Sequence, residues 1–441
     1  MHLEFVEGSS KKFWEATLDG AALKVRWGRL GTAGQEKTHT FKTAKEAREE
    51  HDALVQQKTK KGYVRTDAPK EPPRAPNLEA AMFASLVSDK AAALVYADWL
   101  QGQGNPWGEL ITVQYAREKR PKDKALQKRE QALLSALPLP DPKLGTVTWR
   151  RGCIDALHLF NEQDWMDDAY DVMVVLRPVL DLPHCGGLRE LRTGVIRWDA
   201  NTEDVPAVLA EVAKRPLAKY VRRLFLGDIP TDVDMDHHVI GDVRALSKQF
   251  PNLESLKLHS GAARWRGRTN FEFGPLKLPK LESLIIETCG LSSARAKQLT
   301  ASVLPALEEL EVWCGSKDYG ANATAKDLLP VLTAFPTVTR LGLKNNEFTD
   351  ELVAPLVKSP LASRLKSLDL SLGVLSSEGV KVLVANAAKF ASLEVLDVSE
   401  SYLSRADVKA LKKAFPRVEL EAGEQKTLED DFPERYVSVH E

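Results

Sequence analysis

The chain has 441 residues, too many for one ordinary hydrophobic core, so two or three domains are expected. A formal net charge of −1 argues against a protein that binds polyanions over its whole surface. Its four cysteines form no C-x-x-C pair and have no histidines at zinc spacing, so we expect no metal site, no cofactor and a reducing compartment. No charged-then-apolar leader and no apolar run of membrane length is found, which predicts a cytoplasmic protein.

The first 65 residues form a basic module, with 13 Lys and Arg against 9 Asp and Glu. Alternating apolar residues predict four antiparallel strands, at residues 2–6, 13–18, 22–30 and 36–41. Thr43 and Glu46 have the spacing of a capping box, which predicts a helix that runs to about Lys60. The sequence therefore predicts a small sheet-plus-helix domain at residues 1–66.

A proline-rich linker and a helical segment follow. Four prolines within residues 67–76 exclude a helix or a central strand, so residues 67–77 are expected to be an extended linker. Apolar residues then recur at spacings of three and four, which predicts a short helical domain at residues 78–145. Its predicted helices lie at residues 78–87, 92–100, 108–117 and 124–136.

The rest of the chain is repetitive. The pattern L-x-x-L-x-L-x-x-N/C, or its phase, starts at residues 221, 253, 281, 307, 338, 365 and 393, at intervals of 26 to 32. Degenerate copies occur near Cys153 and Leu188, and each later strand is followed by an apolar pair eight residues apart. In those later repeats a Ser or Thr follows the first apolar residue, and we expect it to be the helix N-cap.

A strand and a helix repeated about every 28 residues are typical of a leucine-rich-repeat solenoid, whose parallel strands form the concave face. The fold class is therefore α/β, with the solenoid at residues 146–425. The segment beyond the last repeat, residues 426–441, is expected to cap its open end.

The residues between the repeated leucines are expected to point outward on the concave face. Phe225, Ile285 and Trp313 would then be exposed among charged residues, an arrangement typical of protein interfaces. Acidic residues in the C-terminal half favour a protein partner over a nucleic acid. The predicted partner surface consists of Phe225, Ile285, Glu309, Glu311, Trp313, Lys344, Asp369 and Asp397.

The stretch from Val25 to Gln35, V-R-W-G-R-L-G-T-A-G-Q, closely resembles the WGR domain, as do residues 12–14, Phe41 and residues 61–63. The resemblance covers residues 1 to about 65. WGR domains occur in DNA-dependent poly(ADP-ribose) polymerases, where they grip DNA breaks, and in bacterial proteins. In that setting the motif tryptophan packs on a sugar at a DNA end and the motif arginine makes polar contacts. The resemblance implies these roles for Trp27 and Arg29.

The residue types agree in part with that implication. A tryptophan flanked by Lys24, Arg26 and Arg29 suits base stacking together with phosphate contacts. These four residues are the predicted nucleic-acid site. In the alternative interpretation Trp27 packs on the helix as core and the arginines are only solvated.

Residues 78–117, with L-V-Y-A-D-W-L at 94–100 and G-N-P-W-G-E at 104–109, resemble the repeat-companion domain of myxobacterial and planctomycete proteins. The usual G-D-P-R-G-E stretch differs here at Asn105 and Trp107. No activity is established for that family, so the resemblance bears on architecture and source. Asp98 is interpreted as a helix-surface residue and Trp99 as core.

Three further motifs are interpreted as solvated loops or faces. They are the R-W-R-G-R stretch at 264–268, the basic run from Arg117 to Arg129, and His237-His238 among Asp232, Asp234 and Asp236. Phosphate binding by the first two and metal binding by the third are the alternatives.

No nucleotide-binding loop and no G-x-S-x-G motif is present, so we expect a protein that is not an enzyme. Two functions remain open. The first is an adaptor whose WGR module binds DNA or RNA and whose solenoid binds a protein. The second is a scaffold for protein partners alone.

Overall fold

The computed structural model describes residues 2–7, 10–65, 90–162, 171–197, 203–229, 235, 238–261, 264–265, 268–269, 271–428 and 434–439. The chain divides into two compact units, Met1–Ser88 and Asp89–Glu441. The expected linker at 67–77 and the expected helix at 78–87 lie outside the described residues. Among the helices that are described, none is long and apolar enough to cross a membrane.

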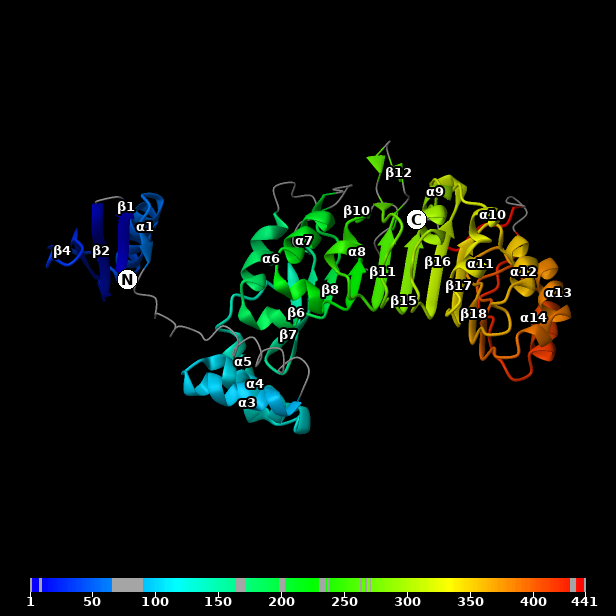
Figure 1. The fold of residues 1–441 in the computed structure, drawn as a ribbon, viewed down its shortest axis with the longest axis horizontal. Coiled ribbons are helices and arrows are strands. Elements are labelled where there is room, and N and C mark those ends of the chain that lie inside the picture. The colour runs from blue at the N-terminus through cyan, green and yellow to red at the C-terminus, as the bar shows by residue number, and fades with distance from the viewer. Residues whose placement is uncertain are drawn as a thin grey trace. The chain divides into compact units, whose positions relative to one another are not determined.

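In its described residues the first unit is an antiparallel sheet with one helix beside it (Figure 1). The sheet order is β4-β3-β2-β1-β5, and all four predicted strands are present, together with a fifth that pairs with β1. The elements are β1 (His2–Glu7), β2 (Ser10–Asp19), β3 (Ala22–Arg29), β4 (Gln35–Thr40), α1 (Ala44–Lys60) and β5 (Val64–Arg65).

The core of this unit lies between the sheet and α1. Trp14 and Ala16 from β2 and Leu23 and Val25 from β3 are buried with Leu3, and α1 adds Leu54 and Val55. Thr43 caps α1 as predicted, because its hydroxyl accepts a hydrogen bond from the Glu46 N–H at 3.1 Å. Glu46 bonds instead to the N–H of Lys42, so the second half of the predicted capping box is wrong.

The second unit begins with three helices, α3 (Lys90–Gly102), α4 (Pro106–Lys119) and α5 (Lys124–Leu134). Asn105 and Pro106 start α4, since the Asn105 side chain accepts the N–H of Trp107 and proline suits the first turn. Gly108 allows close packing of α3 on α4, because a Cβ there would lie 2.4 Å from the carbonyl oxygen of Ala97.

An eleven-stranded sheet forms the body of the second unit. Its order from β20 to β6 follows the chain in reverse, and all strands are parallel except β6, which forms an antiparallel hairpin with β7. The strands are β6 (Gly145–Arg150), β7 (Cys153–Leu159), β8 (Glu190–Thr193), β9 (Arg223–Leu226), β11 (Ser255–Ser260), β15 (Ser283–Thr288), β16 (Glu309–Gly315), β17 (Arg340–Asn346), β18 (Ser367–Asp369), β19 (Val395–Asp397) and β20 (Glu419–Glu421).

Helices connect these strands and pack on one face of the sheet (Figure 1). They are α6 (Val172–Leu180), α7 (Asp204–Ala213), α8 (Leu246–Gln249), α9 (Ser293–Thr300), α10 (Ala325–Leu328), α11 (Val331–Ala334), α12 (Thr349–Lys358), α13 (Ser377–Ala385) and α14 (Arg405–Ala414), with 3-10 turns η1 (Pro183–Gly187), η2 (Pro216–Tyr220), η4 (Lys317–Tyr319) and η5 (Ala387–Lys389). Two small sheets pair β10 (Gly241–Asp242) with β14 (Phe271–Glu272) and β12 (Arg264–Trp265) with β13 (Arg268–Thr269).

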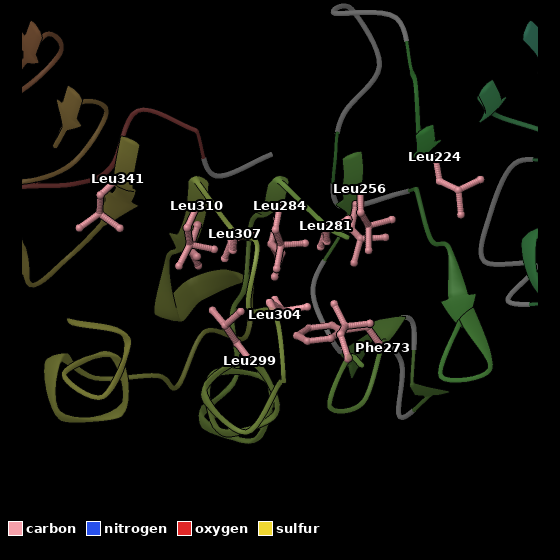
Figure 2. Close-up of a cluster of buried hydrophobic side chains, with 14 of the residues drawn as sticks. Leu224, Leu256, Phe273, Leu281, Leu284, Leu299, Leu304, Leu307, Leu310 and Leu341 are labelled. Carbon is pink, nitrogen blue, oxygen red and sulfur yellow. The ribbon is translucent and has the colours of Figure 1, made fainter. Parts of the chain in front are cut away.

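The repeated leucines build the core, as predicted. Figure 2 shows leucines at equivalent positions of successive strands, from Leu224 to Leu341, beside Leu299 and Phe273 from the helical side. Leu224, Leu299, Leu341 and Phe273 are each at most 2% exposed. The leucine-rich-repeat solenoid expected from the spacing is confirmed, and its degenerate first copies are β7 and β8.

The predicted N-caps are right at Ser292, Ser376 and Ser404. They are wrong for α12, where Phe348 is the cap and Thr349 is the first helical residue. Thr349 is fully buried, and its hydroxyl donates to the Asn346 backbone carbonyl at 3.1 Å. That hydroxyl ties the strand end to the helix instead of capping the helix.

The C-terminal segment differs from the prediction that residues 426–441 cap the open end. Within it, residues 434–439 run back across earlier repeats, and Val439 bonds to Asn345 at the end of β17. The N-terminal end of the sheet is covered by the β6–β7 hairpin, whose turn at Gly152 accepts a hydrogen bond from the Trp107 indole of α4 at 2.7 Å.

Candidate functional site

Trp27 lies on the side of β3 that faces α1, and it follows the buried residues Leu23 and Val25 on that side. Strand alternation puts Leu23, Val25 and Trp27 on one side, and the first two are buried whereas Trp27 is 36% exposed. Its partner across the strand pair is Trp14, which is 2% exposed. Trp14 thus serves as the core aromatic, and Trp27 presents an indole to solvent.

Cations lie on the same side as Trp27, and all but the half-buried Lys58 are exposed. Arg29 follows it by two residues on β3 and pairs across the sheet with Lys12 on β2. The Lys58 ammonium at the end of α1 lies 5.9 Å from the Trp14 ring centroid and 5.2 Å from that of Tyr63. Burial, and then the positive charges of Lys61 and Lys12, lower the pKa of Lys58.

We call Lys12, Trp27, Arg29, Lys58 and Lys61 the Trp27 face. Within residues 2–7 and 10–65 none of its four cations forms an ion pair with a carboxylate; the ion pairs of that part involve other residues. After burial, the charges of Lys61 and Lys12 are what lowers the pKa of Lys58, so like charges are held close together here. Such a cluster stabilises an anion placed against it.

The other two predicted site residues lie on the opposite side of the sheet. The Arg26 guanidinium bonds to Glu15 at 2.7 Å, and the Lys24 ammonium lies 2.8 Å from Glu36. The hydrogen bond from Arg26 lowers the pKa of Glu15. The structure therefore separates Lys24 and Arg26 from Trp27 and Arg29, because adjacent strand residues face opposite ways.

The glycines of the motif let its turn pack on Phe13. Gly34 has a φ of +72°, and a Cβ there would lie 2.5 Å from the Phe13 ring and 2.7 Å from the Trp27 carbonyl oxygen. A Cβ on Gly28 would lie 2.7 Å from the Cα of Gly34. Only glycines fit at these two positions, so the turn fixes the backbone that carries Trp27 and Arg29.

Sequence reasoning found Trp27 and Arg29 but missed Lys12, Lys58 and Lys61 as members of the site. These lysines come from another strand and from the end of α1, more than ten residues from the motif in sequence. The register of β2 on β3, which sets Lys12 opposite Arg29, is the signal that would have found the first of them.

On the solenoid, the structure brings all eight predicted partner residues to the face opposite the helices. Pairing in register aligns Phe225, Ile285, Glu311, Asp369 and Asp397 in one row of neighbouring strands. Glu309 lies one row before them, and Trp313 and Lys344 lie one row after.

The aromatic residues of this face are half-buried, so the expectation that they are freely exposed is wrong. Phe225 has the Lys257 ammonium 4.7 Å and the Arg192 guanidinium 5.4 Å from its ring centroid. The Trp313 indole donates to Glu311 at 2.6 Å, with Lys344 5.4 Å from its ring. Ile285, on a strand between them, is half-buried as well.

Charge changes sign along this face. Arg192 and Lys257 flank Phe225, whereas Asp369, Asp397 and Glu421 stand on three successive strands in register. Repulsion from Asp397 is the largest cause of the raised pKa of Glu421. Lys344 reaches Asp369 at 3.0 Å, and although burial lowers its pKa, Asp369 and Glu311 raise it overall.

Glu311 adds a protonatable group at the middle of the face. Burial raises the pKa of this carboxyl in spite of Lys344 and Trp313. Glu287, the next buried carboxylate, accepts from His259 at 2.6 Å and lies 2.8 Å from Lys257, and these contacts lower its pKa although burial alone would raise it.

The remaining motifs gain little support as sites. Asp98 is exposed on α3, as interpreted, whereas Trp99 is only half-buried and stacks on the buried Tyr96 with centroids 5.9 Å apart. In the basic run, Arg117 pairs with Glu130 and Arg129 with Glu109. The described residues of the R-W-R-G-R stretch belong to the short paired strands β12 and β13.

The acidic histidine loop lies mostly outside the described residues, as do Asp232, Asp234, Asp236 and His237. His238 itself is buried, and burial lowers its pKa to about 3. Over the described part of the chain, no three His, Cys, Asp or Glu side chains gather as a metal site would require.

One pocket near the first repeats has no counterpart in the sequence analysis. It holds about 200 Å³ and is lined by His158, Phe160, Asn161, Glu162, Val195, Asp228 and Ile229. His158 Nε2 is 3.4 Å from Asp228, and Arg192 also pairs with that carboxylate. The volume is below the roughly 300–1,000 Å³ of typical ligand sites, so we assign it no ligand.

Comparison with known proteins decides the identity of the first unit. The family model of the WGR domain matches residues 1–70. Residues 1–70 form a WGR domain. No curated protein matches the chain.

A solved structure is similar in fold to this WGR-domain protein over the whole chain. A protein from Bacteroides fragilis, determined by a structural genomics consortium, has a TM-score of 0.54 at 21% identity, covering 100% of this chain and 99% of that one. An internalin from Listeria monocytogenes has a TM-score of 0.31 at 14% identity and covers 61% of this chain and 68% of its own. The first likeness concerns the fold alone, and the second is too weak for an argument.

Proposed function

We propose that this protein is a non-enzymatic adaptor whose WGR domain binds nucleic acid, at DNA ends or strand breaks, and whose solenoid binds a protein. One observation carries the nucleic-acid half: an exposed indole lies on the same side of the sheet as four cations that have no described carboxylate partner. A terminal base or sugar would stack on Trp27 while phosphates meet Lys12, Arg29, Lys58 and Lys61.

The test is a fluorescence titration of the full chain with blunt, nicked and single-stranded DNA over a series of salt concentrations. We expect affinity to fall steeply with salt, because each phosphate contact releases counterions. Trp27→Ala is expected to weaken binding by about 5- to 150-fold, the equivalent of about 1–3 kcal/mol for one stacking contact. Absence of binding at low salt and micromolar DNA would refute this half of the proposal.

For the solenoid we propose a protein partner on the concave face, with a basic segment against its acidic C-terminal strands. The support is the pair of Asp397 and Glu421, for which no ion pair is described, on the same face of the sheet as the half-buried aromatic residues. Co-purification from the native host identifies the partner, and Asp369→Lys with Asp397→Lys is expected to lose it. The matched control is Lys381→Glu on α13, which is exposed on the helical side. Equal loss with both variants contradicts the assignment.

The competing function is a protein scaffold without nucleic-acid binding. It is favoured by the ion pairs of Lys24 and Arg26, which neutralise the opposite side of the WGR sheet. A chain that keeps its protein partner and binds none of the DNA probes would be such a scaffold.

The remaining expectations form part of the same proposal. Four free and buried cysteines support a cytoplasmic location. The α3–α4 packing at Gly108 and the Asn105 cap suit the resemblance of residues 78–117 to the repeat-companion domain of myxobacterial and planctomycete proteins. Proteomic fractionation of the native host tests the location.

A further inference from the structure

Residues 434–439 lie across the carboxyl ends of the solenoid strands, with a bend at Ser438. Val439 bonds to Asn345 at the end of β17, and Ser438 bonds to Leu372, which lies three residues after β18. Tyr436 bonds to Tyr402 in the loop after β19. By strand register Asn345 and Leu372 stand at equivalent places in two successive repeats, and Tyr402 lies two residues beyond the equivalent place in the third. From Tyr436 to Val439 the segment therefore crosses the repeats of β19, β18 and β17 in turn, along the edge formed by their carboxyl ends.

The loops beneath this segment share an unusual backbone conformation. Asn345, Leu372 and Glu400 have φ values of 49°, 64° and 49°, in the left-handed region that residues other than glycine rarely adopt. The carbonyl oxygen of Leu372 accepts the N–H of Ser438 at 2.8 Å, and that of Glu400 accepts the Ser438 hydroxyl at 3.5 Å. Two of the three repeats thus present a backbone carbonyl oxygen to Ser438, and the third presents the Asn345 side chain to Val439.

Asn345 recognises the backbone of the segment directly. Its side-chain amide donates to the Val439 carbonyl oxygen at 2.5 Å and accepts the Val439 N–H at 2.9 Å. Because these are main-chain contacts, they do not depend on which side chain follows. A buried asparagine that satisfies both backbone groups of one residue is a device for holding an extended peptide.

Side chains add selectivity to this backbone recognition. Val437 is 1% exposed, and Val439 packs with Trp313, Tyr319, Met235 and Cys289. Alternate apolar residues of the segment are therefore covered, as in an extended peptide whose every second side chain enters a pocket.

The polar ends of the contact are paired as well. Arg435 donates to Asp350 at 3.1 Å and to the Val374 carbonyl oxygen at 3.0 Å. The Tyr402 hydroxyl accepts the N–H of Tyr436 at 3.0 Å. This edge thus contacts a basic residue, an aromatic residue and two valines two positions apart, which are Arg435, Tyr436, Val437 and Val439.

We propose that this edge of the solenoid is a peptide-docking site for an extended segment of a partner protein, with the pattern basic-aromatic-Val-x-Val, and that residues 434–439 occupy it in cis. Tethering gives the internal segment an effective concentration on the order of millimolar. A partner segment therefore binds only when it competes with, or follows release of, the internal one. The site lies beside the concave row and is independent of the nucleic-acid face.

The test uses the full chain with Val437→Asp and Val439→Asp, which place charges where the internal segment is covered. The probe is a fluorescent synthetic peptide of residues 434–439. We expect saturable micromolar binding to this variant and at least tenfold weaker binding to the unsubstituted chain. Asn345→Gly in the variant background keeps the left-handed backbone, removes both amide contacts and is expected to weaken peptide binding tenfold or more.

The matched controls are a peptide with both valines replaced by aspartate, which should not bind, and the chain with Glu434→Ala, an exposed position that should behave as the unsubstituted chain. Equal binding to the substituted and unsubstituted chains, or no binding to a folded variant at 100-fold excess of peptide, overturns the proposal. If the variant does not fold, hydrogen exchange on the unsubstituted chain decides: Ser438 and Val439 should exchange faster than β17, and equal protection overturns the proposal.

Discussion

At the residue scale, the Trp27 face allows a comparison of two cations on one strand. Arg29→Ala and Lys24→Ala remove the same charge from β3, but from opposite sides of the sheet. If nucleic acid binds the Trp27 face, Arg29→Ala should lower the salt slope of binding by about one phosphate contact, and Lys24→Ala should leave it unchanged. Equal effects of the two variants would mean that long-range charge, and not this face, governs binding.

Single residues were also where sequence reasoning was least complete. Trp27 and Arg29 could be found because the motif is contiguous, whereas Lys58 and Lys61 join them only through the packing of α1 on the sheet. The placement of Lys24 and Arg26 with Trp27 was wrong for a reason already present in strand geometry. Residues one apart on a strand face opposite sides, so the motif could never present all four together.

At the element scale, the turn between β6 and β7 is the most constrained feature of the second unit. Gly152 has a φ of +80°, and a Cβ there would lie 2.3 Å from Ile111 Cγ1 on α4. We expect Gly152→Ala to lower the free energy of unfolding by roughly 2–5 kcal/mol, through backbone strain together with overpacking. Denaturant unfolding followed by circular dichroism measures the loss.

The control for this substitution is Gly102→Ala at the end of α3, where a Cβ would meet nothing within 4 Å. Alanine favours the helix over glycine, so this variant should be unchanged or slightly more stable. A Gly152→Ala chain as stable as the control would show that the turn and α4 move apart readily.

Elements with local signals were predictable, and those that depend on distant contacts were not. The leucine spacing is repeated in each strand of the solenoid, so β9, β11 and β15 to β19 followed from the sequence with their inward and outward faces. Residues 434–439 have no regular period, and their position depends on bonds to Asn345 and Leu372, more than sixty residues away. The half-burial of Trp313 by Val439 could not be expected for the same reason.

At the scale of the whole molecule, the two units carry charge of opposite sign, each on one of its faces. The WGR domain gathers uncompensated positive charge beside an indole, and the solenoid places carboxylates in register toward its C-terminal end. Under the proposed function, these opposite charges would favour different partners on the two units. The formal net charge of −1 hides this division, which is why bulk composition alone argued against a polyanion partner.

The joint between the helices and the solenoid should respond to acid. His184 is 7% exposed between the Trp107 and Trp149 rings, with centroids 4.8 Å and 5.7 Å from its own, and burial lowers its pKa from 6.5 to about 4. The native state holds His184 in its neutral form. The free energy of unfolding is therefore highest above pH 6.5, and it decreases as the pH falls toward about 4.

At pH 5 that loss amounts to about 2 kcal/mol relative to pH 7.5, from the roughly 1.36 kcal/mol that each unit of pKa difference represents. His184→Leu keeps an uncharged side chain of similar size at both values and should lose correspondingly less between them. Urea unfolding of both chains at pH 7.5 and pH 5 measures the difference, in which the contribution of other titrating groups such as buried His238 cancels. Equal losses in the two chains would mean that His184 is protonated in the native joint, and that the contact between α4 and the first repeat opens to water without unfolding.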